Sequence, residues 1–284
     1  MDDPEQKPAY YTQEEWEEQV KKYTLSSMAA TYGKILAEQG NKEEALESLE
    51  KAVKMSEGSD PELNESYAEI LIEQEQFQKA FDELSAFIEE GNSTDGMKDL
   101  LKKAFVEVKG KAQDYQAYFD QLDQAATDRL REELRKEMMN KPAPSFSLED
   151  LEGNVVSLEN LKGRTFILDF WAVWCGPCVS SFPGMKRVVE KYRDDPSVEF
   201  LFVITWENEE DEKKHAQDYI IKNDYPFHVL MDYEDNVVGA FKVRGIPTKF
   251  IVDKNGNIRF TKIGYDGNDE KLIKELDLMI EMVK

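Results

Sequence analysis

The sequence of 284 residues is poor in cysteine and histidine, with two residues of each type. A framework of structural disulfides needs several cysteines spread along the chain, so that class of small, cross-linked protein is excluded. Cys175 and Cys178 are separated by only two residues, and a bond between them would restrict the unfolded chain very little. We therefore expect this pair to serve a purpose other than stability.

Half of a zinc site is one alternative purpose for a C-x-x-C pair, but such a site needs two further ligands. The chain has no other cysteine, and neither His215 nor His228 has ligand spacing to a partner. We predict that both histidines are surface or structural residues. Neither a metal ion nor a bound cofactor is expected, so any chemistry would belong to the cysteine pair itself.

Long apolar runs are also absent from the sequence. No apolar stretch reaches the ~18–20 residues that a membrane-spanning helix needs, so no span is predicted. The longest stretch, from Thr165 to Val173, contains Asp169 and is typical of a buried strand. The start, Met1 to Glu5, is acidic and polar, whereas a signal peptide has a basic start followed by an apolar stretch. The sequence therefore indicates either a cytoplasmic protein or the trimmed form of an exported one.

Positive charge is scarce, because 36 Lys and Arg stand against 59 Asp and Glu, for a net charge of −23. Such a surface repels nucleic acid and anionic lipid headgroups, and we exclude both as partners. Hydrophobic residues make up 40% of the chain, which is enough to build real cores. The length fits two domains better than one.

Residues 1–139 contain few strand signals and are predicted to form helices joined by short breaks, with a tight turn at Gly40-Asn41. Five pairs of positions recur at an offset of 35 residues: Gly33 and Ala68, Leu36 and Leu71, Ala45 and Ala80, Leu49 and Leu84, Ala52 and Phe87. This period resembles the tetratricopeptide repeat, a helical hairpin of about 34 residues. We predict an all-α domain of helical hairpins over 1–139. An irregular helical domain with a coincidental period is the alternative.

Residues 140–284 are predicted to form an α/β domain with a mixed central sheet. Pro142 and Pro144 end the last helix of the first domain and favour an extended chain. Beyond them strand and helix patterns alternate. Strands are predicted at 146–148, 155–158, 165–171, 198–205, 227–232, 249–253 and 257–264, and helices at 179–193, 211–223 and 268–283.

The C-x-x-C pair follows a predicted buried strand and precedes a predicted helix. At a helix N-terminus, the unpaired amides and the helix dipole favour the thiolate of the first cysteine, Cys175. Cys178 lies one turn further on the same face, within reach of the first sulfur. Pro177 fits the first helical turn, and Gly176 allows another backbone to approach closely. This spacing suits attack by Cys175 on a disulfide, with Cys178 resolving the mixed disulfide.

Two segments carry a resemblance to a known family. One runs from Asp169 to Cys178, Asp-Phe-Trp-Ala-Val-Trp-Cys-Gly-Pro-Cys, and the other is Gly245-Ile246-Pro247-Thr248. With them, residues 142–284 resemble thioredoxin-fold proteins of the TlpA/ResA type, which are thiol–disulfide oxidoreductases of the bacterial cell envelope within the AhpC/TSA and redoxin-like superfamily. The resemblance implies that residues 207–231 are an insertion that supplies an additional helix and strand.

The resemblance also implies residue roles. Asp169 corresponds to a buried acid whose pKa should be raised and which could accept the proton of Cys178. Pro247 should follow a cis peptide bond and pack against the disulfide. No lysine on the strand 198–205 faces Asp169, so its charge partner is expected to be absent. Trp171 is either a core or a docking residue. The predicted substrate-binding residues are Trp174, Gly176, Pro177, Ile246 and Thr248.

The leading functional hypothesis is reduction of protein disulfides in the periplasm or cell envelope, with an upstream thiol reductant as electron source. The export signal or lipoprotein anchor would then lie outside this sequence, and the cytoplasm is the alternative location. A peroxiredoxin-like antioxidant is a second possibility, although Ala172 stands where peroxide binding needs threonine. A redox-inactive scaffold that binds a peptide or protein through the helical domain is a third.

Overall fold

The computed structural model describes residues 12–284, which divide into two compact units between Arg129 and Leu130. We predicted the boundary between residues 139 and 140, after the end of the helical region. The division falls instead within a single long helix, α7 (Tyr115–Glu137). The last turns of α7 place Leu134 in the main core of the second unit, which explains the difference.

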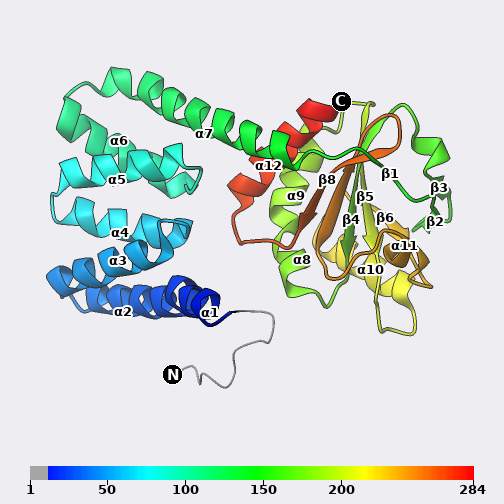
Figure 1. Cartoon of the computed structure of the whole chain (residues 1–284), viewed down its shortest axis with the longest axis horizontal. Helices are drawn as coiled ribbons and strands as arrows, with labels where there is room; N and C mark the ends of the chain where they lie inside the picture. Colours follow the sequence, from blue (N-terminus) through cyan, green and yellow to red (C-terminus); the bar gives the residue numbers. More distant parts are fainter. Residues whose placement is uncertain (1–11) are drawn as a thin grey trace. The chain divides into compact units, whose positions relative to one another are not determined.

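The described part of the first unit is helical, as predicted. Figure 1 shows its helices running back and forth as antiparallel hairpins. In chain order they are α1 (Gln13–Gln19), the π-helical segment η2 (Val20–Leu25), α2 (Ser26–Glu38), α3 (Lys42–Ser56), α4 (Pro61–Glu73), α5 (Phe77–Glu89), α6 (Asp95–Lys109), the short 3-10 turn η3 (Ala112–Asp114) and α7.

The positions that recur at an offset of 35 residues lie in equivalent places of two hairpins, α2–α3 and α4–α5, and all of them are buried. A Cβ atom on Gly33 would come within 2.8 Å of Leu49 Cγ, so the close approach of α2 and α3 requires glycine there. The 35-residue period therefore marks equivalent buried positions in the two hairpins. Membership of the tetratricopeptide family stays a prediction.

The second unit contains one mixed sheet in the order β1-β8-β7-β4-β5-β6-β2-β3. Strands β4, β5 and β6 are parallel, and the other pairings are antiparallel. The strands are β1 (Lys141–Pro142), β2 (Ser147–Asp150), β3 (Val155–Ser157), β4 (Thr165–Trp171), β5 (Val198–Ile204), β6 (His228–Met231), β7 (Thr248–Val252) and β8 (Asn257–Ile263).

Helices cover both faces of this sheet, and β4 supplies both cores because successive side chains on a strand point to opposite faces. Ile167 and Trp171 pack in the core beneath α9 (Phe182–Lys191), α10 (Glu212–Lys222) and α12 (Asp269–Val283). The alternate residues of β4 pack with α11 (Asn236–Ala240) and the 3-10 turn η4 (Glu159–Leu161). The predicted α/β fold with a mixed sheet is confirmed.

The helix predicted at 179–193 differs in the structure, where it starts earlier and is broken. It consists of α8 (Gly176–Ser180) and α9, which are separated at Ser181. Pro183 lies in the first turn of α9 and has no N–H with which to continue the hydrogen bonds of α8. The insertion does supply one helix and one strand, α10 and β6, as the resemblance implied.

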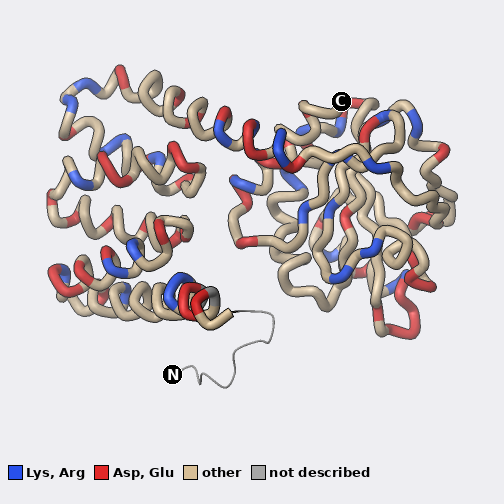
Figure 2. Tube along the Cα trace, viewed as in Figure 1, with Lys and Arg blue, Asp and Glu red and all other residues tan. Residues whose placement is uncertain are grey.

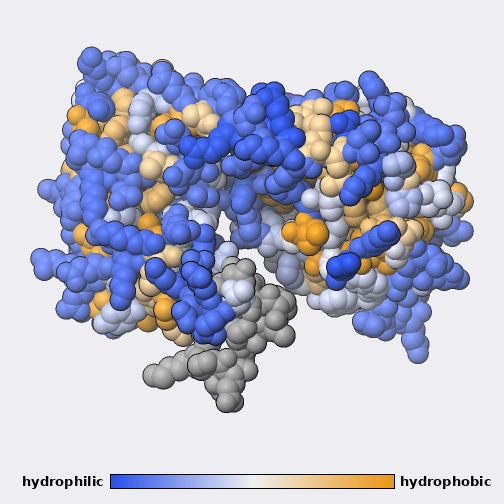
Figure 3. Space-filling model, in the orientation of Figure 1, coloured by the Kyte–Doolittle hydropathy of each residue, from blue (hydrophilic) through white to orange (hydrophobic). Residues whose placement is uncertain are grey.

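The distribution of charged and hydrophilic residues in the structure agrees with the acidic composition of the chain. Acidic residues lie along both units in Figure 2, and hydrophilic side chains cover most of the visible surface in Figure 3. Among the helices of residues 12–284, none combines the length and the apolar character that crossing a bilayer requires.

Candidate active site

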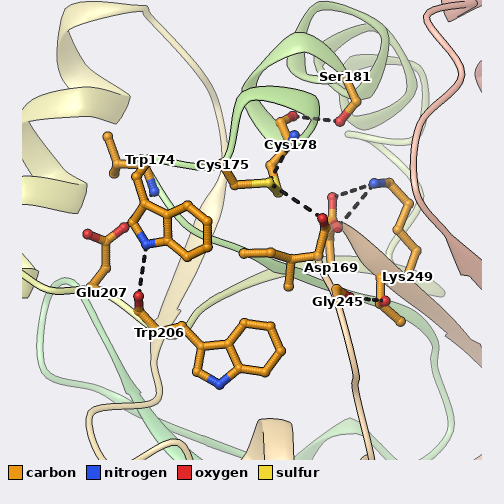
Figure 4. The surroundings of a disulfide bond; sticks show 12 residues. Asp169, Trp174, Cys175, Cys178, Ser181, Trp206, Glu207, Gly245 and Lys249 are labelled. Carbon is orange, nitrogen blue, oxygen red and sulfur yellow. Dashed lines mark hydrogen bonds and ion pairs between the residues drawn. A yellow bond between two sulfur atoms is a disulfide. The ribbon is translucent and has the colours of Figure 1, made fainter. Parts of the chain in front are cut away.

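The two cysteines lie where β4 leads into α8, and they are joined by a disulfide with Cα atoms 5.2 Å apart (Figure 4). Cys175 is the N-cap of α8, and its Sγ accepts a hydrogen bond from the Cys178 backbone N–H at 3.2 Å. Cys178 is fully buried, whereas Cys175 keeps 4% of its surface exposed. Gly176 and Pro177 beside it are exposed. The sulfur of Cys175 is therefore the one that an incoming group can reach.

The loop that precedes β7 lies against this sulfur. The Ile246–Pro247 peptide bond is cis, as predicted, and the Ile246 carbonyl oxygen is 3.6 Å from Cys175 Sγ. Thr248 is buried, and its hydroxyl donates to the Gly245 carbonyl at 2.7 Å. The side chain of Thr248 thus holds the loop from inside, while the backbone of the loop faces the disulfide.

Asp169 is buried in the middle of β4, and the expectation that it lacks a charge partner was wrong. Lys249 lies opposite it on β7, with Nζ 3.1 Å from each carboxylate oxygen (Figure 4). Burial raises the pKa of Asp169, and the Lys249 charge opposes this rise without cancelling it. The Asp169 carboxyl group therefore keeps its proton to a higher pH than an ordinary aspartate does.

Trp174 and Trp171 have different surroundings. Trp171 is fully buried in the core, whereas Trp174 is 55% exposed next to Cys175. The Trp174 indole N–H donates to the Trp206 carbonyl oxygen at 2.8 Å. Asp235 in turn accepts from the Trp206 backbone N–H at 2.9 Å. Trp174 is thus an apolar surface beside the sulfur, held in place by the chain that follows β5.

Glu207 is a second buried carboxylate at this site, which sequence reasoning did not identify. Its side chain is 1% exposed and accepts from the Val173 backbone N–H at 2.5 Å. His215 on α10 contacts its other oxygen at 3.2 Å, so this histidine has a structural role. Because Val173 and Trp174 lead directly into Cys175, Glu207 holds the segment that positions the attacking sulfur.

Replacing Glu207 with alanine is expected to release this segment. The Val173 N–H would lose its acceptor in a partly buried place, a loss worth about 1–3 kcal/mol of stability. Hydrogen exchange at the Val173 amide should accelerate, and the midpoint of thermal unfolding should fall. Glu207→Gln keeps an acceptor oxygen and is the matched control. Unchanged exchange in the alanine variant would contradict the role assigned to Glu207.

A helix-capping C-x-x-C pair beside a cis-proline loop, on a mixed sheet covered by helices on both faces, defines a thioredoxin-fold thiol–disulfide oxidoreductase. Comparisons with known proteins agree. Residues 139–261 match the model of the AhpC/TSA family. The thiol-disulfide oxidoreductase ResA of Bacillus cereus is 34% identical over 123 residues, which are 43% of this chain and 68% of that protein. The chain belongs to the ResA family of thiol–disulfide oxidoreductases.

Two further similar proteins extend the comparison. The thioredoxin-like protein YneN of Bacillus subtilis is 31% identical over 122 residues, which are 43% of this chain and 69% of YneN. A crystal structure described as a putative thiol:disulfide interchange protein DsbE from Chlorobium tepidum is 29% identical, with a TM-score of 0.44. That match covers 50% of this chain and 96% of the Chlorobium chain.

Proposed function

We propose that this protein reduces disulfides of other proteins, and that Cys175 is the nucleophile and Cys178 the resolving thiol. The observation that carries this assignment is the asymmetry of the pair. Cys175 keeps a small exposed surface, and its Sγ accepts a hydrogen bond from the Cys178 backbone N–H at 3.2 Å. The Cys178 side chain is fully buried. A hydrogen bond to sulfur favours its thiolate form, which is the form that attacks disulfides.

In the first step, the Cys175 thiolate attacks one sulfur of the substrate disulfide, and the other substrate sulfur leaves as a thiolate. Cys178 then attacks Cys175 of the mixed disulfide, its thiol proton passes to Asp169, and the second substrate sulfur leaves. The substrate gains two electrons and the cysteine pair loses two. An upstream thiol reductant returns the pair to the dithiol, and no other cofactor takes part in the proposed cycle.

Asp169 suits the role of proton acceptor because its pKa is raised by burial. A base is most effective when its pKa approaches the working pH. The substrate would bind over the Cys175 sulfur, with Pro247 as its neighbour. The residues proposed to contact it are Trp174, Gly176, Pro177, Ile246 and Thr248, the last two through the backbone of the cis-proline loop.

Reduction is the proposed direction because the dipeptide between the cysteines is Gly176-Pro177. The same dipeptide occurs in thioredoxin, whose potential is about −270 mV. We also propose that the helical unit selects the protein whose disulfide is reduced, and that the protein works in the cell envelope. The resemblance to envelope proteins of the TlpA/ResA type supports this location.

Reduction of insulin by dithiothreitol tests the activity directly. The 284-residue chain is expected to accelerate the precipitation of the released insulin B chain. No acceleration at any protein concentration would overturn the proposal. Peroxide consumption measured in parallel tests the antioxidant alternative, which the AhpC/TSA match raises. Little consumption is expected, because Ala172 has no hydroxyl with which to hold a peroxide.

A further inference from the structure

One side of the helix α2 presents large apolar side chains to solvent. Four of them are between 45% and 58% exposed: Leu25, Met28, Tyr32 and Ile35. Because residues three and four apart are neighbours on a helix, these side chains lie along a single stripe, which we call the α2 stripe. A different set of residues forms the side of α2 that packs against α3. A contiguous apolar stripe on a surface marks a site of interaction.

The 35-residue period shows which contact this stripe lacks. Its equivalents in α4 are buried: Met28, Tyr32 and Ile35 correspond to Leu63, Tyr67 and Ile70. The helix α4 packs against the hairpin that precedes it as well as against α5 and α6. By contrast, α1 and η2 run directly into α2, and no hairpin precedes α2 among residues 12–284 (Figure 1). The α2 stripe is therefore a stacking face without its neighbour, whereas the end of a stable array of repeats presents a polar face.

The charges around the α2 stripe favour contact between copies of the chain. The net charge is −23, so two copies repel each other over most of their surfaces. Residues 19–37 are an exception, because they contain three lysines and no acidic residue. One of these lysines, Lys22, is paired with Glu57 of its own copy at 2.7 Å. Two copies can therefore approach through this helix without bringing carboxylates together.

We propose that the α2 stripe packs against the α2 stripe of a second copy of this chain. A two-fold symmetric dimer brings the same patch of both copies together, so one apolar stripe supplies both halves of the interface. Within the described residues, the second unit offers no matching face. Its large exposed apolar side chains lie on five separate segments and are Val155, Trp174, Ile221, Tyr233 and Ile263. The proposal concerns the helical unit and does not depend on the chemistry of the cysteine pair.

The size of the α2 stripe sets the strength of this contact. Half of four large side chains on each copy amounts to about 1,000 Å² of buried surface or less, which is the lower end of the range for specific interfaces. Interfaces of this size are typical of transient complexes. We therefore expect a reversible dimer that forms at micromolar concentrations and dissociates on dilution.

Sedimentation velocity of the 284-residue chain over a range of concentrations tests the proposal. The dimer fraction should rise with concentration. Tyr32→Glu places a charge in the middle of the stripe and should raise the dissociation constant at least about tenfold, because buried aromatic side chains carry much of the binding energy of an interface. Met28→Gln removes apolar surface without adding charge and should also weaken the dimer.

Ser27→Glu is the matched control, because Ser27 is exposed on the polar side of α2 and gains the same charge as Tyr32→Glu. Its dissociation constant should equal that of the native chain. Thermal unfolding of dilute samples should be unchanged in all three variants, since each replaced side chain is exposed. A native chain that stays monomeric at every concentration would overturn the inference and assign the stripe to another partner. Equal dimer strength in Ser27→Glu and Tyr32→Glu would overturn it as well.

Discussion

Substituting serine for Cys178 is expected to convert this protein into a covalent trap for its substrate. Cys175 would still attack a disulfide, since its sulfur and the Cys178 backbone N–H that stabilises the thiolate are unchanged. The mixed disulfide would persist because the resolving thiol is missing. We expect turnover with insulin to be abolished and one substrate molecule to accumulate per chain. Mass spectrometry under non-reducing conditions measures this adduct.

Cys175→Ser is the matched control for the trap. It leaves Cys178 as the remaining thiol, and Cys178 is fully buried, so neither turnover nor an adduct is expected. Adducts that form equally well with either cysteine removed would show that both sulfurs are accessible, against the asymmetry on which the proposed function rests. Applied to an extract, the Cys178→Ser chain should also collect the proteins that we propose the helical unit selects.

The second large effect is expected from Lys249→Met. Lys249 and Asp169 are both almost completely buried, and their ion pair is the compensation that the structure provides for the carboxylate. Removing one partner of a buried pair typically destabilises a protein by about 3–5 kcal/mol. Chemical denaturation at pH 8 measures this loss as a fall in the free energy of unfolding.

The size of this loss should depend on pH in a definite direction. Burial raises the pKa of Asp169 above that of the unfolded chain, so the folded protein holds a proton that the unfolded one has released, and stability falls as pH rises through that interval. Without Lys249 the folded pKa rises further, and the interval extends to higher pH. Lys249→Met should therefore be most damaging at alkaline pH and least damaging at acid pH.

The double variant Asp169→Asn/Lys249→Met serves as the control, because it removes both charges together. Most of the stability lost at pH 8 should return in it, and the pH dependence of the difference should disappear. If the single and double variants were equally unstable at pH 8, packing around Lys249 rather than the unpaired carboxylate would be responsible.

The parts of the site that sequence reasoning located are local in the chain. Cys175 and Cys178 belong to one short motif with Asp169, and the cis bond at Pro247 belongs to a second. Lys249 stands two residues after Pro247, directly after that second motif, yet its role was not foreseen. Its contact with Asp169 depends on the antiparallel register of β7 and β4, and a register between distant strands cannot be read from either strand alone.

Glu207 was not identified for a related reason. Its buried position depends on the turn after β5, where Trp206 has a left-handed backbone with φ of 54° and is held by Asp235. A side chain in such a turn has no periodic pattern that would predict burial. The Trp-Glu-Asn sequence at the end of a predicted strand, with His215 on the following helix, was the available signal. The short helix α11 was not predicted because five residues carry too little periodicity.

The helix α7 also has a practical meaning for dissecting this protein. Its first turns place Tyr115 and Leu122 in the core of the helical unit, and its last turns place Leu134 in the core of the catalytic unit. A fragment that begins at residue 140, where the predicted α/β domain begins, would lose Leu134. The core beneath the sheet would then contain a gap. A catalytic fragment intended for crystallisation or redox titration should therefore begin at or before Leu130, where the compact unit begins.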